Sequence, residues 1–123
     1  MPAMPVTTPI SVSTERIGTI AVVHLFGELD LATVEQVEQA VTAAAEDVSA
    51  LILDLEGLSF LASTGLSLLA RWSQRAEEES FGLRIVAARR QALRPLQITG
   101  LDSVLTIDAT VDEALVALPR RAG

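Results

Sequence analysis

The order of apolar runs along the chain is the feature that most constrains its fold. Residues 17–26, 50–55 and 83–88 are rich in β-branched and aliphatic side chains, as expected of strands buried in a sheet. The first of these runs has apolar residues at both parities, which indicates a central strand covered on both faces. Segments with helical periodicity separate the three runs. Strands joined through helices imply right-handed crossovers and a mostly parallel sheet.

Two further strands are expected at the ends of this core. Residues 10–14 have strand character, and the short Glu-Arg-Ile-Gly stretch that follows predicts a hairpin with the next strand. A weak strand is expected at 104–107. The chain is therefore predicted to be a single α/β domain at 10–118, with a mixed, mostly parallel sheet of about five strands packed with about four helices. Residues 1–9, which include three prolines, are expected to form a flexible tail, and 119–123 a C-terminal tail.

Helix signals fill the gaps between the strands. Two segments have the spacing of a capping box, Thr33 with Gln36 and Thr110 with Glu113. The first of these helices is expected to run to about Glu46. A third helix is expected at 91–99, where Pro95 should kink or restart it.

Another helix is expected to begin within LSFLASTGLSLL, residues 58–69. Ser63 and Thr64 stand at its start, where a side-chain oxygen can cap the free backbone N–H groups of the first turn. One stripe of this helix is expected to face the core, namely Leu66, Leu69, Ala70 and Ser73. Trp72 falls near the edge of that stripe and is expected to be partly buried.

Composition narrows the range of functions. With 123 residues, half of them apolar, the chain can bury a core without disulfides, and it contains no cysteine. Its longest apolar stretch, residues 20–26, is too short to span a membrane, so a soluble cytoplasmic protein is expected. The net charge of -7 argues against nucleic-acid binding. The cluster of Arg89, Arg90 and Arg94 is interpreted as a solvated helix face.

The sequence offers no catalytic constellation. Ser63 follows a strand and precedes a helix, but Leu61 takes the place of the first glycine of a nucleophile elbow. The single histidine, His24, lies within an apolar strand and is interpreted as a hydrogen-bonded structural residue. An esterase would need Ser63 and His24 to meet. Neither ligand spacing for a metal nor a phosphate-binding loop is present, so no catalytic residue, metal or cofactor is expected.

A hydroxyl at a helix start can instead be the substrate of another enzyme. A phosphoryl group placed there would gain from the free N–H groups and the dipole of the helix N-terminus. From the residues alone, phosphorylation is one option beside simple helix capping.

Three segments resemble the STAS domain of bacterial anti-sigma factor antagonists. LILDLEGLSFLASTGLSLL is similar to the family signature, in which a strand ending in Asp-Leu leads through an apolar loop to Asp-Ser-Ser/Thr-Gly-Leu. LFGELDLATVEQVEQAV resembles the Gly-Glu-Leu-Asp turn that follows the second strand of the family. LRPLQITGLDSVLTI is similar to its third helix and the exit into the last strand. The resemblance extends over residues 10–118 in order.

This resemblance implies a role in transcription regulation. Members bind an anti-sigma factor that is also a serine kinase, and so release the sigma factor; phosphorylation switches them off and a serine phosphatase resets them. The family's phosphorylated hydroxyl corresponds to Ser63. The implied partner-binding residues are Gly27, Glu28, Leu29, Asp30, Ser59, Leu61, Ala62, Ser63, Thr64, Gly65 and Leu66.

The sequence departs from the family at one position of the signature. Ala62 stands where the usual aspartate precedes the phosphorylated serine. This difference keeps a second reading open, in which a divergent STAS module senses a ligand or assembles with other proteins without being phosphorylated.

Overall fold

The computed structural model describes residues 10–119 and contains one five-stranded sheet. The tail expected at 1–9 and residues 120–123 of the expected C-terminal tail lie outside the described residues. In chain order the elements are β1 (Ile10–Ile17), β2 (Ile20–Leu29), α1 (Val34–Ala44), β3 (Ala50–Leu61), α2 (Ser63–Glu79), β4 (Gly82–Val86), α3 (Arg90–Thr99), the 3₁₀ helix η1 (Leu101–Ser103), β5 (Ile107–Asp108) and α4 (Val111–Ala117).

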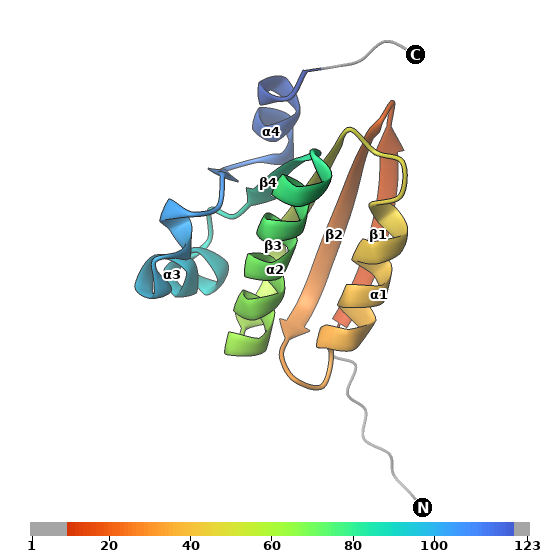
Figure 1. Ribbon diagram of the computed structural model, residues 1–123. Helices are drawn as coiled ribbons and strands as arrows, with labels where there is room; N and C mark the ends of the chain where they lie inside the picture. Colours follow the sequence, from red (N-terminus) through yellow and green to blue (C-terminus); the bar gives the residue numbers. More distant parts are fainter. Residues whose placement is uncertain (1–9, 120–123) are drawn as a thin grey trace, which may run out of the picture.

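The sheet is mixed and mostly parallel, with the strands side by side in sequence order (Figure 1). β1 pairs with β2 in the antiparallel sense, and the three remaining pairings are parallel. α1, α2 and α3 pack on one face, where the larger core cluster lies, and α4 packs on the other through Ala114. The predicted α/β class and the mixed, mostly parallel sheet are confirmed.

The expected hairpin forms, but its turn lies later than predicted. β1 continues to Ile17, and the chain turns at Gly18 and Thr19. Gly18 adopts a φ of 62°, a left-handed conformation that suits glycine in a two-residue hairpin turn. Glu15 and Arg16 had suggested a loop, but both are exposed on a strand at the edge of the sheet, where charged side chains are common.

Two other strand boundaries were wrong. β3 extends to Leu61, well past the predicted end at 55, because pairing with β2 continues through two register shifts. β5 contains only Ile107 and Asp108, whereas a strand at 104–107 was expected.

The Asp108 carboxylate accepts two hydrogen bonds from Arg84 of β4, at 2.7 and 3.1 Å. These bonds raise the pKa of the Arg84 guanidinium above its usual value, while burial opposes the shift.

The capping prediction is confirmed at α4 and wrong at α1. Thr110 Oγ1 accepts a hydrogen bond from the Glu113 N–H at 3.1 Å. Thr33 precedes α1 but makes no side-chain cap, because its hydroxyl bonds to the preceding turn. Of the kink or restart predicted at Pro95, the restart does not occur, because α3 spans this proline as one element.

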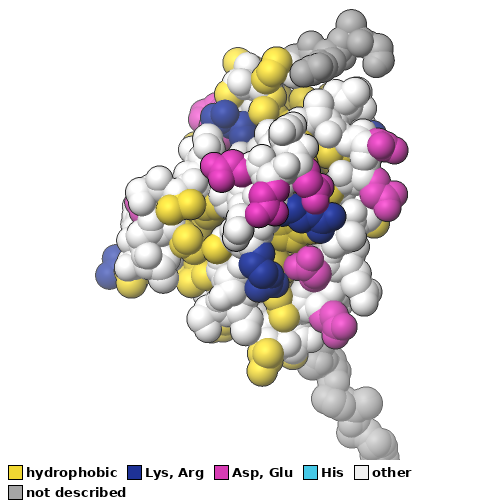
Figure 2. All heavy atoms as spheres, viewed as in Figure 1, with side chains coloured by type: hydrophobic (Ala, Val, Ile, Leu, Met, Phe, Trp, Pro, Cys, Tyr) yellow, Lys and Arg dark blue, Asp and Glu magenta, His cyan; other side chains and the backbone are white. Residues whose placement is uncertain are grey.

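The buried stripe of α2 is rotated relative to the prediction. Its buried residues are Gly65, Leu68, Leu69, Trp72 and Ala76. Of the predicted stripe only Leu69 is fully buried. Trp72 is 1% exposed, against the expected partial burial, and its ring lies 6.5 Å from that of Phe81. On the solvent-facing side of α2, Arg71 pairs with Glu38 and Arg75 pairs with Glu79. Charged side chains of both signs gather over α1 and α2 (Figure 2).

Candidate functional site

The candidate site lies where β2 and β3 end, beside the start of α2 and the turn into α1 (Figure 1). Leu29 pairs with Leu61 at the last position of the ladder, and the Ala62 N–H then donates to the Leu29 carbonyl oxygen at 2.9 Å. The Ser59 hydroxyl donates to the Gly27 carbonyl oxygen at 3.2 Å. These bonds hold the segment before Ser63 against the end of β2, so the two motifs of the sequence form one surface.

Register shifts change which side chains this surface presents. One lies between His24 and Phe26 and another between Gly27 and Glu28 along β2. Bulges of this kind re-aim side chains near the end of a strand. Gly27 has a φ of 116°, a conformation that other residues rarely adopt, so the glycine is required by the backbone path.

The turn between β2 and α1 is organised by the hydroxyl of Thr33. This hydroxyl donates to the Glu28 carbonyl oxygen at 2.7 Å and accepts from the Asp30 N–H at 3.0 Å. Asp30 Oδ1 accepts from the Ala32 N–H at 3.0 Å. Thr33 is 3% exposed, so its hydroxyl fixes the turn from inside. Asp30 acts as a turn former, and Glu28 is left exposed.

Gly65 allows α2 to approach the strands closely. A Cβ atom at Gly65 would lie 2.7 Å from both Leu29 Cγ and Leu61 Cδ1. Real Cβ atoms do not come this close to other carbons, so the first turn of α2 can rest on these two leucines only because residue 65 has no side chain. The contact fixes the position of Ser63 relative to the turn at Glu28.

The two adjacent hydroxyls of the motif have different environments. Ser63 is exposed and occupies the first helical position, because Ala62 is the N-cap residue with ψ 173°. Thr64 is half-buried, and its Oγ1 atom is buried without a hydrogen-bond partner among the described residues. No side chain caps this helix. The alternative in which one of these hydroxyls caps α2 is therefore not realised, and of the two residues Ser63 is the exposed one.

All the partner-binding residues that the motifs imply lie at this end of the sheet, but their side chains differ in exposure. Glu28, Ser59 and Ser63 are exposed, and Gly27, Asp30, Ala62, Thr64 and Leu66 are half-buried. Leu29, Leu61 and Gly65 are buried. The buried residues support the shape of the surface rather than present a side chain on it.

Three exposed apolar side chains at this end escaped the sequence reasoning. Leu31 is 78% exposed in the turn, and Phe26 and Phe60 are 50% and 51% exposed near the ends of β2 and β3. An apolar residue within a turn, such as Leu31, is a signal that could have been used. The orientation of Phe60 depends on the register shifts, which the sequence does not reveal.

His24 lies away from Ser63, on the face of the sheet opposite α1 and α2. Its Nδ1 atom is 2.7 Å from Asp54 Oδ2, and its Nε2 atom is 3.4 Å from Glu15 Oε1. Both ring nitrogens therefore face carboxylates of neighbouring strands. The Ser63 and His24 pair that an esterase would need does not form in this structure.

Residues 10–119 contain neither a metal-binding cluster nor a membrane-spanning helix. No group of three or more His, Cys, Asp or Glu side chains there is arranged to hold a metal ion. Within the same residues, no helix has the length and apolar character needed to cross a bilayer.

Comparison with known proteins gave consistent matches. The family model of the STAS domain matches residues 11–114. The anti-sigma-F factor antagonist RsfB of Mycobacterium tuberculosis is 32% identical over 111 residues, which cover 89% of each chain.

Solved structures show the same similarity. The crystal structure of an anti-sigma factor antagonist from Mycobacterium paratuberculosis has a TM-score of 0.77 at 35% identity and covers 88% of this chain and 92% of that one. The antagonist SpoIIAA is 27% identical and has been solved in an unphosphorylated form, with a TM-score of 0.71 over 85% of this chain and 93% of that one. Its phosphorylated form has a TM-score of 0.66 over 86% of this chain and 97% of that one.

Proposed function

The chain belongs to the STAS domain family, and on this premise we propose that it is an anti-sigma factor antagonist that phosphorylation of Ser63 switches off. In the active state it binds an anti-sigma factor with serine kinase activity and so frees the sigma factor. A serine phosphatase restores this state. The names of the relatives support antagonism, and the two solved forms of SpoIIAA show that a similar chain carries phosphate.

The contrast between Ser63 and Thr64 carries the proposal. Ser63 is exposed, whereas the Oγ1 atom of Thr64 is buried. A kinase must align the acceptor hydroxyl with the transferred phosphoryl group, which requires access to that oxygen. Ser63 meets this requirement without any change in the fold, and Thr64 does not.

The start of α2 can hold a phosphate without being disrupted. No side chain caps the helix, and its first turn contains no acidic residue. The free N–H groups and the helix dipole favour an anion at this position. Phosphorylation would therefore leave the domain folded, as a reversible switch requires.

The effect of the phosphate on binding would be local. It adds about -1.5 to -2 charge at pH 7, to a chain whose net charge is already -7. Salt screens the long-range field beyond about 10 Å. Next to Ser63, however, Ala62 and Leu66 are half-buried apolar residues, so a partner would cover the phosphate beside apolar side chains. Burying an unpaired phosphate there is costly, which would favour dissociation.

Capture of the partner followed by phosphorylation tests the proposal. The chain is immobilised, exposed to lysate of the source cells without ATP, and the bound kinase is identified by mass spectrometry and then purified. With ATP, this kinase should add one phosphate, which Ser63→Ala should abolish and Thr64→Ala should largely preserve. The phosphorylated chain should bind the kinase about a hundredfold more weakly, which corresponds to roughly 2.7 kcal/mol.

Two outcomes would contradict parts of the proposal. A kinase that binds the native chain and Ala62→Asp tightly yet phosphorylates neither would remove the switch and favour the non-phosphorylated STAS module. Binding of no anti-sigma factor at all would remove the antagonist function.

A further inference from the structure

Half of the sheet face opposite α1 and α2 is not covered by any described helix. α4 packs over the half that contains Ile20, Val22, Ala50, Ile52 and Val86. The strand register places another set of side chains on the other half: Ser11, Ser13 and Glu15 of β1, His24, Phe26 and Glu28 of β2, and Asp54 and Phe60 of β3. We call this set the open face. Phe26 and Phe60 are its only aromatic residues other than the His24 imidazole, and each is about half exposed.

The backbone under Phe26 is adapted to this ring. Phe26 pairs with Gly57 across the sheet, and a Cβ atom at Gly57 would collide with the ring and approach the Leu25 carbonyl oxygen to 2.6 Å. The ring therefore occupies space on β3 that another side chain would fill. One side of Phe26 is packed against the sheet and the other is available to a further group.

We propose that residues 1–9 of the same chain dock on Phe26 and Phe60. The segment ends at Ile10, the first residue of β1, which pairs with Gly27. Ser11, the next residue, lies directly opposite Phe26. The segment therefore joins the sheet beside this aromatic pair. Glu28, which pairs with Phe60, is one residue beyond Gly27 along β2.

The length of the segment is sufficient to reach both rings. Reaching β3 from β1 means crossing two strand spacings, about 10 Å in all. Nine extended residues reach up to about 30 Å. Because the segment is tethered beside its site, docking is intramolecular and proceeds at a high effective concentration.

The composition of the segment matches an aromatic surface with an acidic rim. MPAMPVTTP has three prolines, two methionines and no charged side chain. Proline-rich chains lose little entropy on docking to aromatic side chains, and methionine sulfur makes favourable contacts with aromatic rings. Glu15 and Glu28 are exposed on the open face, and a segment without acidic side chains meets no like-charge repulsion there.

A second copy of the chain is a poorer occupant for the same surface. Each copy has a net charge of -7, and a symmetric contact would bring the open-face carboxylates of two copies together. A separate protein could also cover Phe60, and it would then have to displace residues 1–9. These two occupants are distinguished by the experiment below.

Methyl NMR of the full chain tests the docking directly. The chain has two methionines, Met1 and Met4, and both belong to the segment. Labelling methionine methyl groups with ¹³C therefore reports on residues 1–9 alone. We expect the Met4 methyl signal to be displaced from its random-coil position by aromatic ring currents, with nuclear Overhauser contacts to the Phe26 or Phe60 ring protons.

Matched variants identify the surface. Phe60→Leu and, separately, Phe26→Leu should move the Met4 signal toward the random-coil position. Ile98→Ala should not, because Ile98 is a 71% exposed apolar residue of α3, which packs on the other face of the sheet. Amide spectra of each variant show whether it is folded. If Phe26→Leu is not folded, Phe60→Leu alone tests the proposal.

Three results would overturn the proposal. The first is a random-coil Met4 signal without ring contacts in the native chain, which would leave the open face free for a separate protein. The second is a displaced signal that Phe60→Leu and a folded Phe26→Leu both leave unchanged. The third is a displacement that grows with protein concentration, which would show contact between copies. None of these readouts involves a kinase, so the result is independent of the proposed function.

Discussion

The buried hydroxyl of Thr33 donates a 2.7 Å hydrogen bond to the Glu28 carbonyl oxygen and thereby closes the turn between β2 and α1. The Thr33 hydroxyl oxygen in turn accepts from the Asp30 N–H at 3.0 Å. A single hydroxyl thus holds the segment that presents Glu28 and Leu31 at the surface. The position of Thr33 predicted a side-chain cap for α1, but its hydroxyl stabilises the preceding turn instead.

Replacing Thr33 with valine should therefore destabilise the protein. The change keeps the shape of the side chain but leaves two partly buried backbone groups, the Glu28 carbonyl and the Asp30 N–H, without their partner, at a cost of about 1–3 kcal/mol. Urea unfolding gives the free energy of unfolding. The control is Thr42→Val, since the Thr42 hydroxyl, which donates to the Glu38 carbonyl oxygen, is exposed. Equal losses from the two variants would show that the turn does not depend on Thr33.

Gly65→Ala should also destabilise the protein, against the usual trend for a helix. At an exposed position within a helix, replacing glycine with alanine increases the free energy of unfolding by up to about 1 kcal/mol. Here the added methyl group would meet Leu29 and Leu61 at 2.7 Å, and overpacking costs about 1–3 kcal/mol. Thermal unfolding compares it with Ser67→Ala, at an exposed position of α2 that should tolerate alanine. A more stable Gly65→Ala variant would contradict the close packing of α2 on the strands.

Ala62→Asp should stabilise the protein, because Ala62 occupies the uncapped N-cap position of α2. A capping side chain contributes about 0.5–2 kcal/mol relative to alanine. Ala62→Asn should give a similar gain without the charge, and urea unfolding measures both. On the proposed function, the Asp variant should in addition be phosphorylated faster by a kinase of this family. If neither variant is more stable, residue 62 does not act as the cap.

Leu31→Ser should weaken binding of the anti-sigma factor without affecting stability. The side chain is 78% exposed in the turn, so it contributes little to the core. Removing an apolar anchor from an interface costs about 1–2 kcal/mol, or roughly 5- to 30-fold in Kd. Calorimetric titration of the purified partner measures this change.

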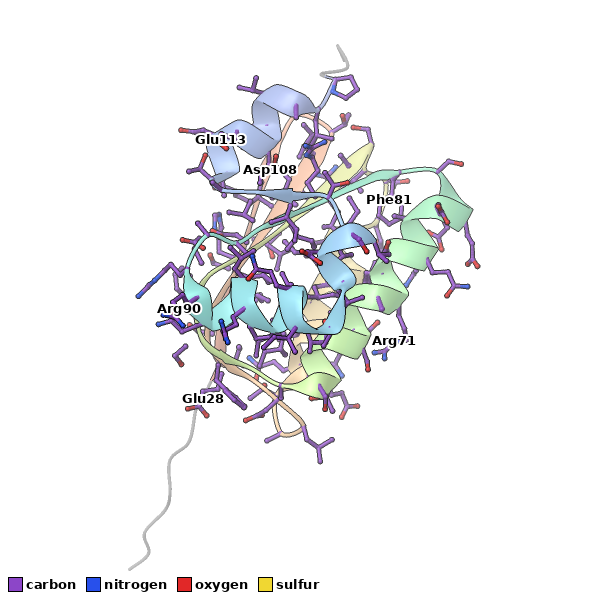
Figure 3. The ribbon with its side chains drawn as sticks, turned by 90° about the vertical axis from the view of Figure 1, so that its left-hand side faces the viewer. Glu28, Arg71, Phe81, Arg90, Asp108 and Glu113 are labelled. Atoms are coloured by element: carbon purple, nitrogen blue, oxygen red, sulfur yellow. The ribbon has the colours of Figure 1, made fainter. Side chains whose placement is uncertain are left out.

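Val116→Ser is the matched control for Leu31. Val116 is 86% exposed on α4. Glu28, next to the turn between β2 and α1, and Glu113 of α4 lie at opposite ends of the molecule (Figure 3). This variant should bind with unchanged affinity, and an equal loss from both variants would place the interface elsewhere.

Local patterns in the sequence were sufficient for the class of the fold and for the order of its main elements. Buried strands were found because β2, β3 and β4 contain dense apolar runs, and α4 because Thr110 and Glu113 have capping spacing. The same patterns misplaced the hairpin turn, since the charged Glu15 and Arg16 are compatible with either a loop or an edge strand. They also missed the second half of β3, where Glu56 and Gly57 interrupt the apolar run.

The sequence by itself determined the α/β order, the two motifs and the presence of adjacent hydroxyls at the start of α2, because these depend on residue type and spacing along the chain. Only the tertiary structure decided which of those hydroxyls is accessible. Packing of Gly65 on Leu29 and Leu61 sets the rotation of α2, which exposes Ser63 and buries Thr64 Oγ1. The register shifts of β3 likewise turn Phe60 toward the open face. Both features arise from contacts between segments far apart in the sequence, which local periodicity does not encode.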